Sequence, residues 1–545
     1  MKKILALALA ALMLIGMMSV AFADGETAAA TTTGLTSDAE ISISNLDVGD
    51  TVNLYKVIER NPDNGGWKLA EGFEGLSSNT NIKKIVDNDA SFAGLTQDDL
   101  EAIATAAKTA KKVSSEATDA TTYTYDTTGN PGMYLALIAP VKADTIYNPI
   151  IVSADYTAGG NSISALSKMG QNGIAKKETV TLTKTTADIT LDSGEIVKFT
   201  VTTTIPAYAA NYTNPTFIMK DQLSTGLKFI VDAEHPFTVT SGDVTYTGAP
   251  VTNDKNFTLT FDSAKIAALV APQAVTVEYY AKLTNEAPYT VNEETNDVTV
   301  EFSNNPDDNT SHGHLKDEIK EYTFTIDGSL FGNSDWTTSE LVKVGVDKDG
   351  NPIEKIVKQD NGHESAALDG AVFGLYTSKA EADASSTNYY TNDVFNGTVT
   401  TANGGLMKIN GLDEGVYYLK ELSAPAGYIK DTATHKIEIT KTTKTVTKTE
   451  TLEDTCVVTY DVEVLESYSV KIDDATTSTY TMTLDGPSIT KSSESDESTD
   501  IVNTKGVELP TTGGMGTTLL YVGGSILVLA AVILLVTKRR MGAND

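Results

Sequence analysis

Apolar and polar residues alternate at every second position along much of the chain. The pattern is clear at residues 179–182 and 197–201, where threonine and valine predominate. Side chains of a β-strand point to opposite faces in turn, so this alternation predicts strands with one buried face. Turn-forming residues interrupt the runs at short intervals, as they do in β-sandwiches. The sequence therefore predicts a mainly β protein.

One segment has helical spacing instead. Its apolar residues recur three and four positions apart and comprise Leu100, Ile103, Ala104 and Ala107. Thr96 is a favourable N-cap residue, and Asp99 follows three positions later, as in a capping box. We expect a helix that begins after Thr96 and ends before Lys111.

The length of 545 residues predicts about three domains at roughly 150 residues each. We expect a mixed α+β domain over residues 36–172 and two all-β domains over residues 178–320 and 336–508. Small and polar residues are concentrated at residues 156–173 and 328–338, which are the predicted linkers.

Two apolar segments lie at the ends of the chain. Residues 4–20 follow two lysines and precede Ala21-Phe22-Ala23, which predicts a secretory signal peptide over residues 1–23. Residues 519–536 are followed by Lys538-Arg539-Arg540, which predicts a membrane-spanning segment with a basic cytoplasmic stop. We therefore expect an exported protein that is held at its C-terminus.

The exported chain is strongly acidic. The whole sequence has 41 basic and 73 acidic residues, and removal of both predicted terminal segments leaves 36 − 72 = −36. Such a surface repels phosphate backbones, which argues against a nucleic-acid partner.

Cys456 is the single cysteine, so it has no partner for an intramolecular disulfide in an oxidising environment. It lies in an alternating run, and we expect a buried strand residue rather than a nucleophile. The wider stretch 440–500 alternates well enough to predict strands inserted in the third domain.

A short motif precedes the C-terminal apolar segment and consists of Leu509, Pro510, Thr511, Thr512 and Gly513. With the span and the basic tail, residues 509–545 resemble the LPxTG sorting signal of Gram-positive surface proteins. In that family a sortase cleaves between the threonine and the glycine and joins the new carboxyl group to an amine. The resemblance implies pilin-type class C and housekeeping sortases as partners, with peptidoglycan as the final attachment. An ordinary single-pass anchor is the alternative.

Residues 415–428 read GVYYLKELSAPAGY. They resemble the E-box, YxLxETxAPxGY, of sortase-assembled pilins and CnaB-type domains, with Leu422 in place of the usual threonine. The resemblance implies an isopeptide bond between Lys343 on the first strand and Asn503 on the last, with Glu421 as the catalytic acid. A plain ion pair between Lys343 and Glu421 is the alternative.

The chemistry of that bond sets physical requirements. The lysine amine must be neutral to attack the amide, and burial among apolar groups lowers the pKa of a lysine. A buried carboxyl group with a raised pKa can act as general acid and base. Alternation alone does not decide which face of its strand Lys343 occupies.

Residues 218–227 are similar to an IxDxLxxGL stretch in the central domain of the same pilins. The resemblance implies that Asp221 is the acid and that Lys184 is joined to Asn296, which we expect on the last strand. Asn304 and Asn305 are the second choice for the asparagine.

Polymerisation of these pilins requires a lysine that accepts the sorting-signal carboxyl group of the next subunit. It usually lies in a YPKN-like motif after the first domain, but residues 147–150 here read YNPI and have no lysine. Lys176 and Lys177 are the candidates. A solvated basic pair is the alternative.

Two further motifs are weaker. Residues 347–351 (DKDGN) resemble the start of a calcium loop, but a hairpin turn is the favoured prediction because the later glutamate is missing. His312 and His314 lack an evident third ligand, and we expect an exposed loop there. We predict no metal and no cofactor.

The resemblance implies tandem Ig-like, Cna-type β-sandwiches after an α+β N-terminal domain. It implies a major pilin that sortase joins to other copies of itself and to minor pilins in a cell-wall-anchored surface fimbria. Such a protein is structural rather than an enzyme, with a host receptor or extracellular matrix as its possible ligand. One alternative is a monomeric wall-anchored adhesin. The other is a wall-anchored enzyme, which would need a catalytic cleft, and we find no catalytic constellation in the first domain.

Overall fold

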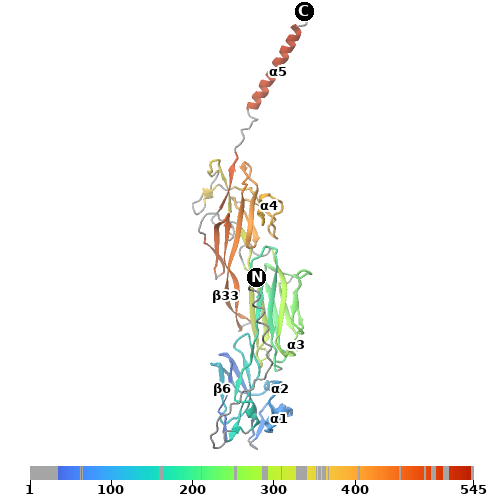
Figure 1. Ribbon diagram of the computed structural model, residues 1–545, viewed down its shortest axis with the longest axis vertical. Helices are drawn as coiled ribbons and strands as arrows, with labels where there is room; N and C mark the ends of the chain where they lie inside the picture. Colours follow the sequence, from blue (N-terminus) through green and yellow to red (C-terminus); the bar gives the residue numbers. More distant parts are fainter. Residues whose placement is uncertain are drawn as a thin grey trace. The chain divides into compact units, whose positions relative to one another are not determined.

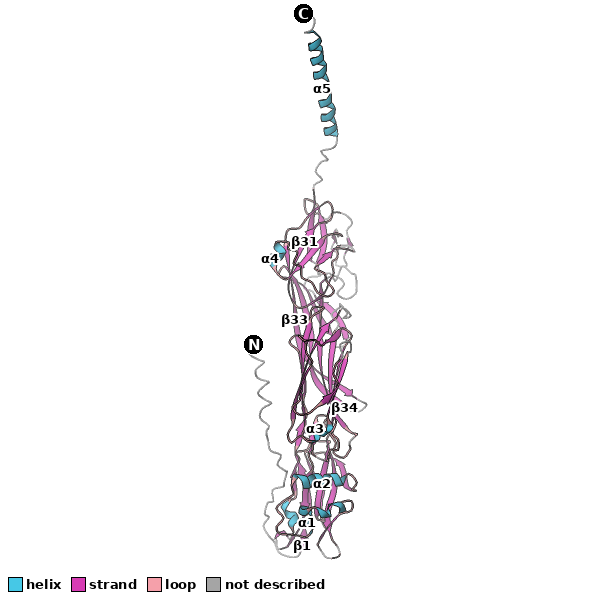
Figure 2. Ribbon diagram, turned by 90° about the vertical axis from the view of Figure 1, so that its right-hand side faces the viewer, coloured by secondary structure: helices cyan, strands magenta, loops and turns pink. Residues whose placement is uncertain are grey.

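The computed structural model describes residues 35–506 and 515–541. Short gaps within these ranges fall at residues 62, 64–65, 159–160, 163, 210, 251–254, 285–292, 309, 327–340, 352, 354–356, 359–363, 366–367, 403–404, 453–455, 484–485 and 493–498. The predicted signal peptide, the predicted linker at 328–338 and the motif at 509–513 lie outside the described residues. The chain forms two compact units, one of Met1–Thr323 with Thr442–Glu466 and one of Phe324–Lys441 with Ser467–Asp545. Strands predominate in both (Figures 1 and 2).

The first unit begins with an α+β domain. Its elements are β1 Leu35–Ser37, β2 Glu40–Ser44, β3 Thr51–Arg60, β4 Trp67–Leu69, the 3-10 turn η2 Glu74–Ser78, α1 Thr80–Val86, α2 Gln97–Ala107, β5 Lys112–Ala117, β6 Thr122–Asp126, β7 Gly132–Ala139, β8 Thr145–Tyr147, β9 Ile150–Ala154, β10 Tyr156–Ala158, β11 Asn161–Ser162, η3 Ala165–Lys168 and β12 Asn172–Ile174.

A central sheet in this domain separates two hydrophobic cores. The sheet has the order β4-β3-β7-β9, with β5 also paired to β3. Tyr55 and Val57 of β3 belong to the core that contains the α1 and α2 residues, whereas Val52 and Leu54 belong to the core shared with the β12-β2-β6 sheet. Residues on the two faces of β3 therefore pack into different hydrophobic cores, one on each side of the sheet.

The predicted helix is confirmed as α2. The Asp99 backbone N–H donates to the Thr96 hydroxyl, and the Thr96 backbone N–H donates to the Asp99 carboxylate, which completes the capping box. Helix α1 was not predicted, and Asn79 is its N-cap.

The linker prediction at residues 156–173 is wrong: β12 pairs with β2, and β10 with β1. Small and polar residues form short strands there because neighbouring strands supply their backbone pairing partners.

The central domain is a sandwich of two five-stranded sheets. Its elements are β13 Lys177–Thr179, β14 Leu182–Thr185, β15 Ile196–Ile205, β16 Phe217–Leu223, β17 Leu227–Ile230, β18 Thr238–Thr240, β19 Tyr246–Thr247, β20 Asn256–Phe261, α3 Ser263–Ala267, β21 Gln273–Leu283, β22 Glu294–Ser303 and β23 His312–Glu321. One sheet has the order β14-β15-β21-β17 with β18 paired to β21, and the other has the order β19-β20-β16-β22-β23. Inward residues of both sheets form one hydrophobic core.

The second unit contains the C-terminal β domain and a separate helix. Its elements are β24 Phe324–Ile326, β25 Leu341–Val346, β26 Val357–Lys358, β27 Glu364–Ser365, β28 Val372–Tyr376, α4 Lys379–Asp383, β29 Thr398–Thr400, β30 Ile409–Leu412, β31 Gly415–Ser423, β32 Tyr428–Ile429, β33 Thr434–Leu452, β34 Cys456–Ile472, β35 Ala475–Thr483, β36 Gly486–Ser492, β37 Thr499–Lys505 and α5 Met515–Met541. The main sheet has the order β29-β28-β31-β33-β34-β35-β36, and β37 lies between β25 and β32 in a smaller one. Within α5, Tyr521–Arg539 has a mean hydropathy of 2.1 and is long enough to cross a membrane.

Strands β33 and β34 are unusually long, and their distal halves, Thr442–Glu466, belong to the first unit. There, Glu318 of β23 accepts hydrogen bonds from Lys448 at 2.8 Å and from the Tyr460 hydroxyl at 3.3 Å. Cys456 is the first residue of β34 and is half-buried against Val458, Tyr460 and Val462. Its predicted place in a strand is confirmed, whereas the predicted burial is only partial.

Candidate functional site

The central sandwich encloses Lys184, Asp221 and Asn296, called here the central trio. Lys184 lies on β14 of one sheet, whereas Asp221 on β16 and Asn296 on β22 belong to the other. The burial pattern of each strand alternates, and all three residues fall on its inward face. A bond within the trio would therefore join the two sheets through the core.

The contacts of the central trio are close and fully desolvated. The Lys184 ammonium lies 2.9 Å from the Asp221 carboxylate and also contacts the Asn296 side-chain oxygen. The side chains of Lys184 and Asp221 are both 0% exposed. Burial lowers the pKa of Lys184 and raises the pKa of Asp221, in each case against the attraction between the two groups. Both directions favour a neutral amine beside a neutral acid.

A fourth side chain, not identified from the sequence, completes this site. Tyr279 of β21 is 0% exposed, and its hydroxyl donates to Asp221 at 2.7 Å. The same oxygen accepts a hydrogen bond from the Asn296 amide nitrogen at 2.8 Å. Its only sequence signal is a position on the inward face of an alternating strand, which many aromatic residues share.

Asn296 does not lie on the last strand of the domain, because β23 follows β22. The prediction of its strand position is therefore wrong, whereas its contact with Lys184 is present. Asn304 and Asn305 follow the end of β22, and the main-chain oxygen of Asn304 accepts a hydrogen bond from the Tyr212 hydroxyl.

The C-terminal domain encloses the second set, Lys343, Glu421 and Asn503, called here the C-terminal trio. Lys343 lies on β25 and Asn503 on β37, which pair as parallel neighbours, and Glu421 lies on β31. Their exposed fractions are 0%, 1% and 0%. The structure thus decides what alternation left open, namely that Lys343 points inward.

Glu421 contacts both of its partners. Its Oε1 accepts a hydrogen bond from Asn503 Nδ2 at 2.8 Å, and its Oε2 lies 3.4 Å from Lys343 Nζ. Lys343 Nζ donates to Asn503 Oδ1 at 2.5 Å. Burial lowers the pKa of Lys343, and this effect outweighs the interaction with Glu421, which raises it. One carboxyl group therefore spans the amine and the amide nitrogen.

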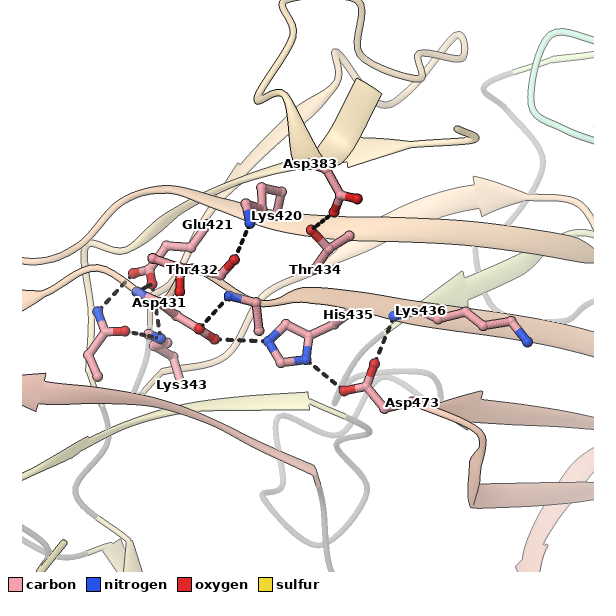
Figure 3. A network of polar contacts seen from close by, with 12 residues as sticks. Lys343, Asp383, Lys420, Glu421, Asp431, Thr432, Thr434, His435, Lys436 and Asp473 are labelled. Atoms are coloured by element: carbon pink, nitrogen blue, oxygen red, sulfur yellow. Dashed lines mark hydrogen bonds and ion pairs between the residues drawn. The ribbon is translucent and has the colours of Figure 1, made fainter. Parts of the chain in front are cut away.

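A loop between β32 and β33 fixes the position of Glu421. The backbone N–H of Asp431 donates to Glu421 Oε2 at 2.7 Å. His435 lies between two carboxylates, with Nε2 2.9 Å from Asp431 and Nδ1 2.8 Å from Asp473 (Figure 3). Both ring nitrogens can donate only when the imidazole is protonated. None of these three residues was singled out from the sequence.

The candidate linking lysines lie beside the YNPI segment. Strand β13 pairs with β8 so that Lys177 is opposite Tyr147, and the backbone N–H of Asn148 donates to the Lys176 carbonyl oxygen. Lys177 Nζ is 2.9 Å from the Asp47 carboxylate. Partial burial lowers the pKa of Lys176.

The weaker motifs have structural roles. At residues 347–351 the chain turns, and the Asp347 carboxylate accepts backbone hydrogen bonds from Asp349 and Asn351. The loop predicted at His312 and His314 is wrong, because both lie on β23, where β22 supplies a pairing partner. Within the described residues, no group of three potential metal ligands comes together.

Three family models match separate parts of the chain. The T6 antigen Ig-like domain matches residues 36–172, the prealbumin-like fold domain SpaA matches residues 353–452, and the LPXTG cell wall anchor motif matches residues 501–541. The sequence is 27% identical to the trypsin-resistant surface T6 protein of Streptococcus pyogenes serotype M6 over 568 residues, which covers 92% of this chain and 95% of that protein.

The solved structure of the T6 backbone pilin of serotype M6 Streptococcus pyogenes is similar, with a TM-score of 0.55 and 22% identity. The match covers 88% of this chain and 100% of that one. At this identity the likeness shows a shared fold, built from multiple Ig-like and prealbumin-like domains with a few helices in the first.

Proposed function

Because this chain is a homologue of the Gram-positive backbone pilins and carries an LPXTG cell-wall anchor, we propose that it is the shaft subunit of a covalent surface pilus. Its central and C-terminal domains are CnaA- and CnaB-type sandwiches, each closed by one Lys–Asn isopeptide bond, and they follow the α+β domain. The observation that carries this proposal is the pair of buried trios, in each of which a lysine amine contacts an asparagine amide beside a carboxyl group.

In the C-terminal trio, the Lys343 amine attacks Asn503 Cγ, so that an Nζ–Cγ bond forms and the Cγ–Nδ2 bond breaks. Glu421 takes a proton from Nζ at one oxygen and gives a proton to Nδ2 at the other, and ammonia leaves. The contacts of Glu421 with both nitrogens support this assignment. The central trio performs the same net reaction with Lys184 and Asn296.

Intact mass tests the bonds directly. Residues 24–508 retain every described strand, and the described span of α5 that they omit is not buried. We expect this fragment to weigh two ammonia masses less than its sequence predicts, and Glu421→Ala and Asp221→Ala each to restore one. A wild-type mass equal to the plain sequence contradicts the cross-links.

Sortase is the proposed partner that joins Thr512 of one subunit to Lys176 or Lys177 of the next, with minor pilins and peptidoglycan as further attachments. Two observations support these lysines as acceptors. Both lie beside Tyr147-Asn148-Pro149, and the lowered pKa of Lys176 increases the neutral fraction of its amine.

Wall extracts test polymerisation. We expect a high-mass ladder that is lost in the Lys176→Ala, Lys177→Ala double variant. Lys142→Ala is the matched control, because Lys142 also pairs with Asp47. A single band in the wild type indicates a monomeric wall-anchored adhesin, and a ladder unchanged in the double variant excludes these two lysines.

A further inference from the structure

The two trios differ in how their acids reach the amide. Glu421 Oε1 accepts a hydrogen bond directly from the amide nitrogen of Asn503. Asp221 has one methylene fewer, and its Oδ2 is occupied by Lys184 and Tyr279. Its Oδ1 is buried and has no hydrogen-bond partner among the described residues. Among the described residues, no hydrogen bond joins Asp221 to Asn296 Nδ2, the nitrogen that must leave.

The Tyr279 hydroxyl fills this gap. It donates to Asp221 Oδ2 at 2.7 Å and accepts a hydrogen bond from Asn296 Nδ2 at 2.8 Å, and it also lies 3.1 Å from Asn296 Oδ1. The phenol thus connects the acid to the amide, which in the C-terminal trio are connected without an intermediary.

The position of this hydroxyl is fixed by packing. The Tyr279 ring stacks on Phe199 with a centroid distance of 5.4 Å and meets the edge of Phe229 at 5.3 Å. Strand pairing places Tyr279 directly opposite Phe199 on β15. Because these rings already restrict the Tyr279 side chain, little further conformational entropy is lost when its hydroxyl takes the position that the reaction requires.

We propose that Tyr279 is a catalytic residue of the central cross-linking reaction, in which it relays a proton from Asp221 to the leaving nitrogen of Asn296. This inference rests on the proposed isopeptide chemistry. The Nζ–Cγ bond forms and the Cγ–Nδ2 bond breaks. Asp221 takes a proton from Nζ, the phenol passes its own proton to Nδ2 and regains one from Asp221, and ammonia departs.

The relay requires a phenol that stays protonated until the transfer. Burial raises the pKa of Tyr279 well above its ordinary value. Tyr279 therefore acts as a neutral donor and acceptor. It gives one proton and receives one, so the phenol is again protonated once the bond between Lys184 and Asn296 has formed.

Kinetics of bond formation test the relay. The unreacted chain of residues 24–508 is purified in denaturant from insoluble material, refolded by dilution, quenched in acid at intervals and weighed. Peptide mapping then assigns each ammonia loss to its domain. We expect Tyr279→Phe to slow the central bond by roughly 10²–10⁴-fold, as for loss of a general acid–base group. The C-terminal bond of the same molecules should form at the wild-type rate.

Tyr280→Phe is the matched control, because Tyr280 is adjacent on β21 but on the opposite, half-exposed face. It should leave both rates unchanged. A second variant adds Asp221→Glu to Tyr279→Phe and so supplies the methylene that Glu421 has. We expect it to form the central bond faster than Tyr279→Phe alone.

The outcomes separate the two proposals. A wild-type chain that loses no ammonia contradicts the cross-links themselves. If the wild type reacts, an equal central rate in Tyr279→Phe overturns the relay. A double variant no faster than Tyr279→Phe also overturns it, because the structure attributes the need for tyrosine to the shorter acid.

Discussion

Replacing Glu421 with glutamine should remove the proposed cross-link between Lys343 and Asn503 while preserving the shape of the C-terminal site. Glutamine has nearly the size of glutamate, but it cannot move a proton from Lys343 to the amide of Asn503. The two reactive residues are 160 positions apart. A cross-link that closes a loop of about 160 residues restricts the unfolded chain by roughly 5 kcal/mol in the entropic model developed for disulfides.

That free energy translates into a large change in melting temperature. In residues 24–508 the second unit has roughly 160 residues, for which 1 kcal/mol corresponds to about 2–4 °C, so its transition should fall by roughly 10–20 °C. The proposed cross-link between Lys184 and Asn296 lies in the first unit and does not depend on Glu421, so the transition of that unit should not move.

Differential scanning calorimetry of residues 24–508 measures both transitions, after intact mass has shown that the variant retains one additional ammonia. Glu414→Gln is the control, because Glu414 lies just before the same strand and pairs with Lys441 at a half-buried position. A variant that lacks the bond and still melts within about 2 °C of the wild type refutes the loop-closure reasoning.

Three further predictions concern residues outside the two trios. Glu318→Gln should raise hydrogen exchange in Thr442–Glu466, measured by mass spectrometry, because the buried Glu318 carboxylate holds that segment; unchanged exchange contradicts this role. Asp99→Ala should lower the free energy of unfolding by about 1–2 kcal/mol in urea melts, because it breaks the capping box of α2. Burial raises the pKa of Asp431, but hydrogen bonds from Ala433 and His435 outweigh it and lower the pKa overall. The stabilisation of the folded state that this lower pKa represents is present above the unfolded value of about 4 and is lost as the pH falls through the lower folded pKa. The destabilisation caused by His435→Asn should therefore shrink as the pH is lowered below about 4 in urea melts.

Local patterns predicted a large part of the fold. Alternation gave the mainly β character, and the capping box with its apolar face located α2. Short polar segments were less informative, because the short strands in 156–173 and the start of β23 have compositions that loops share. Their pairing depends on neighbours such as β1 and β22, which local composition does not report.

The candidate sites divide in the same way. Motif resemblance led to Glu421 and Asp221 and to the lysines and asparagines beside them, and the structure brings each trio together. Tyr279 and His435 carry no motif, and nothing in the sequence relates them to residues tens of positions away. The contacts of Tyr279 with Asp221 and of His435 with Asp473 arise only when strands from distant parts of the chain pack.

The sequence by itself determined the strand pattern, the acidic surface, the helix α2 and the residue types that the proposed cross-links require. Tertiary structure alone decided that Lys343 points inward, that Tyr279 stands between Asp221 and Asn296, and that half of the β33–β34 hairpin belongs to the first unit. The physical reason is range. Periodicity and capping act over a few residues, whereas burial of a lysine beside an amide 160 positions away depends on how whole sheets pair and pack.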